Sequence, residues 1–307
     1  MRTNIAWRAG VASDPGLQRS VNEDRVLADE SRGVFLVVDG LGGHAAGETA
    51  AETAVQVLQE WSTSFSSEEN LEREVREAIS AANNEIYQLA QEHKNFEGMA
   101  CVLTLAVAHE EHVTVGHVGD SRLYLAWNGE LRKLTSDHSP VGEQEDSREL
   151  TEEQAMNHPR RNEVYRDVGS RVHRPDDPEF VETKTFLFRP DAALLLCSDG
   201  LSDVLTSAQI SSIVERYEGD PDDVARQLVE AANHAGGKDN VSVVFVPGAE
   251  FVGRNAGAAN AARQRHAVTR IRGEASRWRS IVKNTCLVLM GMVLGIALWI
   301  GIQKFWP

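Results

Sequence analysis

Residues 34–44 read VFLVVDGLGGH, an apolar run that ends at Asp39 and is followed by a glycine-rich turn. Apolar runs of this length, rich in Val, Leu and Phe, are typical of buried strands. Three further aspartates stand at an end of such a run: Asp120 in VGHVGDSR, Asp199 in ALLLCSDGL and Asp239 in GGKDNVSVVFV. We therefore expect four carboxylates to meet at one end of a sheet.

These four carboxylates predict a divalent metal site. Like charges gathered in one place repel one another, so a cation is needed to hold them together. Carboxylate oxygens, backbone carbonyls and water suit Mg²⁺ or Mn²⁺ better than Zn²⁺. The glycines after Asp39 let the backbone turn sharply and bring a carbonyl, such as that of Gly40, within ligand distance. The residues alone thus favour a metal-dependent hydrolase.

Charge is unevenly distributed along the 307 residues. Residues 1–250 hold 22 Lys and Arg against 45 Asp and Glu, a net charge of −23, whereas residues 251–307 carry +8. A body this acidic offers no positive field to a phosphate backbone, which argues against nucleic acid as a partner. The three cysteines lie far apart without a CxxC pair, so we expect neither a disulfide framework nor a zinc site. This cysteine pattern is typical of a protein in the reducing cytosol.

The C-terminal segment differs in kind from the rest. The run from Cys286 to Ile302 contains no charge and is near the short end of what can span a bilayer. We predict a basic linker over 248–280, a transmembrane helix over 281–303 and a short tail over 304–307; a buried core helix is the alternative for the apolar run. The excess of arginine before this run predicts a single-pass anchor in the inner (cytoplasmic) membrane, with the body on the cytoplasmic side.

Residues 1–247 alternate strands and helices, but not in regular βαβ order. We expect strands at about 34–39, 101–109, 112–118, 122–127, 130–134, 181–188, 192–198 and 241–246, and helices at 47–65, 67–91, 206–217 and 221–235. Asn128-Gly129 between two strands predicts a hairpin, hence antiparallel pairing. This pattern favours a layered α+β sandwich, with residues 139–172 as a long polar insertion, partly helical around 151–157.

Six short motifs follow one another in this body: RSVNED (19–24), DGLGGH (39–44), GDSR (119–122), LTSDH (134–138), SDGL (198–201) and KDNV (238–241). Each is weak alone, but the ordered set resembles the metal-dependent protein phosphatases of the PPM, or type 2C, family in their bacterial form. The resemblance covers about residues 7–247. It implies a four-layer αββα sandwich of two antiparallel sheets flanked by helix pairs, to which the sequence adds the C-terminal transmembrane helix.

The resemblance also implies a role for each matching residue. Asp39 would bridge two Mn²⁺ or Mg²⁺ ions, and Gly40 would add its carbonyl to one of them. Asp199 and Asp239 would complete the other. A third, weaker ion is known in the family, and the residues at its positions are Asp120 and Asp203, with Asp199.

The remaining matches surround these ligands. Glu23 and Asp24 would contact metal-bound water. Arg19 corresponds to the arginine that binds the substrate phosphate. A water bridging the two ions would attack phosphorus in line, so Cys197 and Ser198 are not expected to act as nucleophiles.

The motifs depart from the family pattern in one catalytic position. Animal members carry a histidine two residues after the first metal aspartate, thought to protonate the leaving group, and Leu41 stands there. His44 is a candidate general acid; His158 or a metal-bound water are alternatives that the sequence leaves open. Residues 139–172 correspond to the family's variable flap, which we expect to influence substrate choice and turnover.

We therefore expect a membrane-tethered phosphatase acting on phosphoserine and phosphothreonine in proteins, opposing a Ser/Thr kinase. A catalytically silent family member that serves as a membrane-bound binding module is the alternative. A narrower alternative keeps the chemistry but restricts it to one regulatory phosphoprotein. Loss of a metal-ligating aspartate would mark the silent module, and none is lost.

Overall fold

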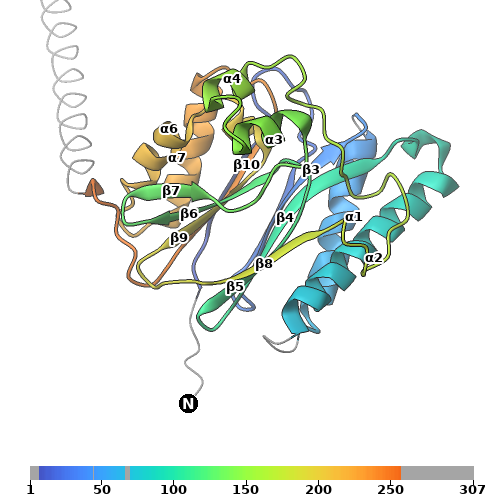
Figure 1. Ribbon diagram of the computed structural model, residues 1–307, viewed down its shortest axis with the longest axis horizontal. Helices are drawn as coiled ribbons and strands as arrows, with labels where there is room; N and C mark the ends of the chain where they lie inside the picture. The colour runs from blue at the N-terminus through green and yellow to red at the C-terminus, as the bar shows by residue number, and fades with distance from the viewer. Residues whose placement is uncertain (1–6, 44, 66–69, 257–307) are drawn as a thin grey trace, which may run out of the picture. The chain divides into compact units, whose positions relative to one another are not determined.

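The computed structural model describes residues 7–43, 45–65 and 70–256 of the chain. Two five-stranded antiparallel sheets pack face to face, and helices cover their outer faces (Figure 1). Three apolar clusters fill the space between these layers. One lies between the sheets, and one lies under each group of helices. The predicted two-sheet sandwich is therefore the architecture of the described residues.

The two sheets draw their strands from different parts of the chain. One has the order β2-β3-β4-β5-β8, made of β2 (Arg25–Asp29), β3 (Val34–Leu41), β4 (Ala100–His109), β5 (His112–Val118) and β8 (Glu182–Leu187). The other has the order β1-β10-β9-β6-β7, made of β1 (Gly10–Asp14), β10 (Val241–Pro247), β9 (Ala193–Cys197), β6 (Arg122–Trp127) and β7 (Glu130–Lys133). The predicted hairpin joins β6 to β7, with φ of 52° at Asn128 and 77° at Gly129.

Strand β3 is buried on both faces, which explains its continuous apolar run. Phe35 and Val37 belong to the cluster between the sheets, whereas Leu36 and Val38 belong to the cluster under the helices. Each of these side chains is fully buried, and each contributes roughly 1.5–3 kcal/mol to folding. Asp39 is thus carried at the end of a strand that is held on all sides.

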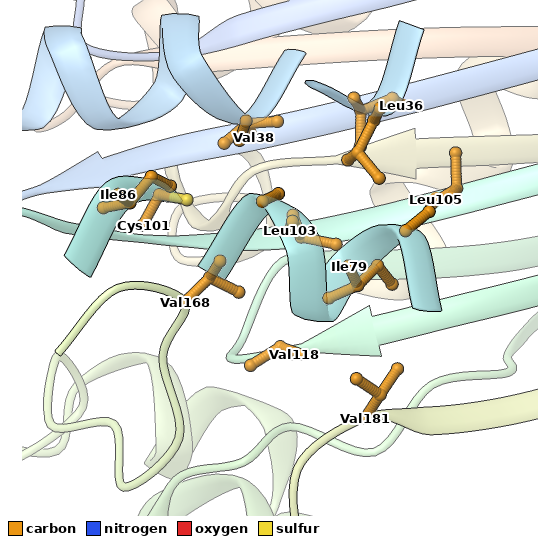
Figure 2. Packing of buried hydrophobic residues seen from close by; sticks show 14 of the residues in the cluster. Leu36, Val38, Ile79, Ile86, Cys101, Leu103, Leu105, Val118, Val168 and Val181 are labelled. Carbon is orange, nitrogen blue, oxygen red and sulfur yellow. The ribbon is translucent and has the colours of Figure 1, made fainter. Parts of the chain in front are cut away.

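Helices α1 (Ala45–Ser62) and α2 (Leu71–Glu92) cover the sheet that contains β3, and a single 3-10 turn, η2 (Lys94–Phe96), follows them. Figure 2 shows Ile79 and Ile86 of α2 packed beside strand residues of this sheet, with Leu103 of β4 among them. The period of the apolar positions in both helices gives each one buried face.

Helices α6 (Ser207–Val214) and α7 (Pro221–His234) cover the second sheet, and the one-turn helix α5 (Asp199–Ser202) precedes them. Local sequence explains where the two longer helices begin. Thr206 and Gln209 form a capping box at α6. The side chain of Asp220 accepts a hydrogen bond from the backbone N–H of Asp222 at the start of α7.

Residues 139–172, here called the flap, contain α3 (Pro140–Asp146) and α4 (Glu152–Met156). Polar contacts hold the flap to the body. The Lys133 ammonium lies 2.7 Å from the Asp146 carboxylate, and the backbone N–H of Ser207 donates to Glu152 at 2.6 Å. The helix α4 falls within the stretch predicted to be partly helical.

Strands β1 and β2 were not predicted from the sequence. Both are short, and most of their residues are only partly buried, so their apolar alternation is weak. Each becomes a strand by pairing with a stronger one: Ala12 of β1 lies opposite Val243, and Leu27 of β2 lies opposite Leu36. Tertiary pairing therefore decides these two elements.

The predicted fold included a C-terminal transmembrane helix, and this part of the prediction is corrected. Among the described residues, no helix is both long enough and apolar enough to cross a membrane. Residues 281–303 and most of the predicted basic linker lie outside the described part of the chain. Residues 248–255 pack against the body, where Phe251 is buried and the backbone N–H of Gly248 donates to the carbonyl of Ala192 at 2.8 Å.

Candidate active site

The four sequence-predicted aspartates meet at one end of the sandwich. Asp39 is at the end of β3, Asp120 lies between β5 and β6, Asp199 follows β9 and Asp239 precedes β10. The carboxyl groups of Asp120, Asp199 and Asp239 all raise the pKa of Asp39 through their charge, so all four are close. Since both sheets contribute, the site lies where the open ends of the sheets face each other.

The backbone around Gly40 is packed too closely for a side chain. A Cβ on Gly40 would lie 2.2 Å from the carbonyl oxygen of Gly47, and a Cβ on Gly47 would lie 2.2 Å from a carboxylate oxygen of Glu23. Glycine at both positions therefore lets the start of α1 approach the end of β3. This approach holds Glu23 beside the backbone of Gly40.

Burial and mutual repulsion raise the pKa of the clustered carboxyl groups. Burial raises the pKa of Asp39 and that of Asp120 well above the usual range, and the neighbouring carboxylates add to the shift. Burial and the charge of Asp239 raise the pKa of Asp199 to about 6, although a hydrogen bond with Asp39 opposes this. Burial raises the pKa of Asp24 to about 7, despite hydrogen bonds from two serines.

This donor set fits divalent cations. Oδ1 of Asp199 and Oδ1 of Asp24 are buried, and neither has a hydrogen-bond partner among the described residues. Buried carboxylate oxygens without a partner are costly, and a hard dication is the group that satisfies several of them at once. Protonation of Asp39 and Asp199 is the alternative when no cation is present, and their raised pKa values reflect it.

Two arginines approach the acids from different segments. The Arg19 guanidinium lies 2.7 Å from Oδ2 of Asp239, with 52% of its side chain exposed. Arg161 of the flap forms an ion pair with Asp203 just after α5. Arg19 is thus at the open rim of the site, whereas the flap residue Arg161 is largely buried, with 16% of its side chain exposed.

The acids proposed for a third ion also come together. A cavity of about 20 Å³ is lined by Asp120, Asp199 and Asp203, together with Arg161 and other flap residues. That volume holds about one water molecule or ion. The flap therefore closes over one side of the acid cluster.

Two polar residues that organise the site were quoted in the motifs but not assigned a role. The side-chain amide of Asn240 donates to the carbonyls of Pro15 and Val21, and its oxygen accepts from the backbone N–H of Glu23. The Ser198 hydroxyl donates to Asp24 at 2.8 Å. The sequence signal that could have identified them is their position next to Asp239 and Asp199 in the motifs.

The histidines are less directly involved. His44 lies outside the described residues. His158 accepts from the backbone N–H of Arg160 on the flap. His117, His138 and Glu182 lie close enough to share an ion, but both ring nitrogens of His117 contact protein oxygens, and Nδ1 of His138 accepts from the backbone N–H of Gly119. His117 and His138 thus serve as buried polar residues next to the backbone that precedes Asp120.

The fold and the acid cluster together define a metal-dependent phosphatase of the type that the motifs resemble. The family model for protein phosphatase 2C matches residues 16–241. The chain therefore belongs to the protein phosphatase 2C family and is a metal-dependent phosphoprotein phosphatase.

Individual relatives make the similarity more specific. The serine/threonine phosphatase stp of Listeria monocytogenes is 36% identical over 244 residues, which are 76% of this chain and 93% of its own. The crystal structure of Mycobacterium tuberculosis PstP/Ppp is 32% identical with a TM-score of 0.70, covering 78% of this chain and 98% of that one. The catalytic domain of PstP in complex with two manganese ions is 30% identical with a TM-score of 0.69, covering 78% and 97%.

Proposed function

We propose that this phosphatase hydrolyses phosphoserine and phosphothreonine in proteins, using two Mn²⁺ or Mg²⁺ ions, and that it opposes a Ser/Thr kinase. The observation that carries the proposal is the convergence of Asp39, Asp199 and Asp239 at a place where Oδ1 of Asp199 and Oδ1 of Asp24 are buried with no hydrogen-bond partner in the described part of the chain. The relatives named as serine/threonine phosphatases, and the manganese in one of them, support the same reading.

In this proposal the acids have different tasks. Asp39, Asp199, Asp239 and the carbonyl of Gly40 would hold the two ions. Asp120 and Asp203, which line the small cavity, would hold a third ion. Asp24 and Glu23 orient water around the ions, and Ser198 keeps the Asp24 carboxylate in place through its hydrogen bond of 2.8 Å.

The ions, when bound, supply the positive charge that activates the attacking water and neutralises the phosphate oxygens. Arg19 binds the phosphate, since its guanidinium is at the exposed rim and carries five donors suited to phosphate oxygens. The ion pair with Asp239 orients the Arg19 guanidinium next to the acid cluster. The phosphate would thus lie between Arg19 and the acid cluster. In-line attack by water places the leaving oxygen on the side of phosphorus opposite to the water.

A covalent phosphoenzyme is not part of this proposal. Burial raises the pKa of the Cys197 thiol to about 12, so it stays protonated. The Ser198 hydroxyl is fully buried and donates to Asp24, so it cannot reach a substrate phosphate. Water is the remaining nucleophile.

The test is hydrolysis of a phosphothreonine peptide by the full chain with Mn²⁺, with Mg²⁺ and with EDTA, alongside Asp39→Asn. Turnover that requires both the metal and Asp39 is the expected result. Metal-dependent turnover by Asp39→Asn at the normal rate would refute the ligand assignment. Opposition to a kinase is tested separately, by incubating an autophosphorylated Ser/Thr kinase from the same cell with the phosphatase and measuring loss of its phosphate; unchanged phosphorylation would contradict it.

A further inference from the structure

A groove of about 1080 Å³ runs beside β7, at the edge of its sheet. Helix α6 provides the facing side through Ser207, Ser211 and Ser212. Figure 1 shows β7 and α6 as neighbours, with the flap helices α3 and α4 near them. The flap also contributes Arg148 to the lining. The groove is therefore separate from the acid cluster but adjoins the segment that covers it.

Unpaired arginines gather in this groove. Arg132, Arg148 and Arg254 line it, and none has a carboxylate partner among the described residues; Arg254 donates instead to the side chain of Asn128 at 2.9 Å. Many exposed arginines elsewhere do have such partners, as in the pairs Arg73–Glu77, Arg174–Asp176, Arg189–Asp191 and Arg226–Asp223. In a body with a net charge of −23, this is a local excess of positive charge.

Two acids line the groove against four basic residues, so they offset only part of this charge. Glu215 is buried, and its carboxylate accepts from the backbone N–H of Arg254 at 2.8 Å. Glu130 is exposed at the hairpin end of β7. Three arginines without a carboxylate partner among the described residues therefore line the groove, and Glu130 is the one exposed acid in its lining.

The strand that borders the groove has an open edge. Strand β7 pairs only with β6 among the described strands. The backbone N–H of Leu134 donates to the carbonyl of Leu123 at 2.8 Å, which fixes the alternation of the ladder. By that alternation Leu131 and Lys133 direct their N–H and C=O groups away from β6. An open edge of this kind can accept an extended segment of another chain.

We propose that this groove docks an extended, acidic segment of the phosphoprotein substrate, at a distance from the phosphorylated residue that is hydrolysed. The inference rests on the proposed function and adds a substrate class: proteins with a run of Asp, Glu or additional phosphorylated residues near the target site. Charge decides the occupant, since unpaired guanidinium groups bind carboxylates and phosphates. The chain's own residues 257–280 are rich in arginine and are not complementary to the groove.

The closing experiment compares two phosphothreonine peptides that differ only in a distal run of Glu or of Gln, at several spacings. The full chain with Mn²⁺ should show a KM roughly tenfold lower for the Glu peptide at the best spacing. The double variant Arg132→Glu/Arg148→Glu should lose this preference and hydrolyse the Gln peptide at the normal rate. A charge-matched control, Arg73→Glu/Lys184→Glu on the other half of the sandwich, should keep the preference.

Other outcomes would overturn the proposal. If the double variant still prefers the Glu peptide, the groove is not the docking site. If the double variant hydrolyses both peptides equally slowly, the arginines act on the flap instead. Binding of the full chain to vesicles with anionic headgroups, lost in the double variant without any peptide preference, would point to a membrane instead.

Binding of the unphosphorylated Glu peptide, measured by fluorescence anisotropy, separates this proposal from the proposed function, because it requires no turnover. Binding that is lost in the double variant supports the groove even if neither phosphopeptide is hydrolysed. N-methylation of alternate residues in the Glu run should weaken binding, since it removes donors to the β7 edge; equal binding would overturn the extended pairing.

Discussion

The carboxylate of Glu145 accepts a hydrogen bond of 2.7 Å from the guanidinium of Arg122, which joins flap helix α3 to the start of β6. Arg122 also binds Asp137, at 2.6 Å for the shortest contact, and is almost fully buried. Asp120 lies two residues before Arg122, in the acid cluster. The flap and the acid site are therefore connected through one buried arginine.

Glu145→Ala should loosen the flap without unfolding the body. Asp137 still pairs with Arg122 in the variant, so the loss is that of one charged hydrogen bond, about 1.5–3 kcal/mol in unfolding free energy. We expect faster proteolytic cleavage within residues 139–172 and a higher KM for phosphoprotein. Glu145→Asp, which keeps the charge on a shorter side chain, serves as the matched variant. Unchanged proteolysis would show that this contact does not hold the flap.

Asp39→Asn should abolish turnover but should not destabilise the metal-free protein. The pKa of Asp39 is raised by burial and by neighbouring carboxylates, so its charged form is unfavourable in the folded state without a cation. We expect activity to fall by roughly a thousandfold or more. Urea unfolding in EDTA should give an unfolding free energy equal to or above that of the wild type. A lower value would mean that Asp39 has a structural role instead.

Arg19→Ala should act on substrate binding rather than on stability. Its ion pair with Asp239 is half exposed, and such pairs contribute at most about 1 kcal/mol. We expect the KM for phosphopeptide to rise roughly tenfold, with a smaller change in kcat, because the guanidinium binds a phosphate in the ground state and the transition state alike. Steady-state kinetics at saturating Mn²⁺ measure the KM and kcat of the variant and of the wild type. Arg19→Lys should recover only part of the affinity, and unchanged kinetics would remove Arg19 from the site.

Stability should decline on the acid side because of His138. Burial, with the charges of His117 and Arg166, lowers the pKa of His138 to about 3, below the unfolded value of about 6.5. The unfolded state therefore binds the proton first, so stability is complete above about pH 6.5 and falls as the pH drops toward 3. His138→Gln, which keeps a neutral acceptor for the Gly119 N–H, should flatten this decline. Urea unfolding of both proteins at pH 7.5 and 5.0 measures it, and parallel declines would exclude His138 as the cause.

Most of the strand and helix pattern could be predicted from the sequence because the core runs are strongly apolar. The run before Asp39 and the Asn128-Gly129 turn each determine their local structure with little help from elsewhere. Strands β1 and β2 could not be predicted in this way, since their residues are half exposed and become strands through pairing with β10 and β3. The predicted transmembrane helix finds no counterpart among the described residues.

The sequence by itself determined which residues form the acid site, because each aspartate follows or precedes a buried strand in a motif with its own glycine or serine. Only the tertiary structure decided what surrounds them. Arg161 reaches Asp203 from the flap, and Asn240 joins the segment before β2 to the start of β10, across more than two hundred residues of chain. Contacts of that separation depend on how two sheets close on each other, and no local pattern encodes them.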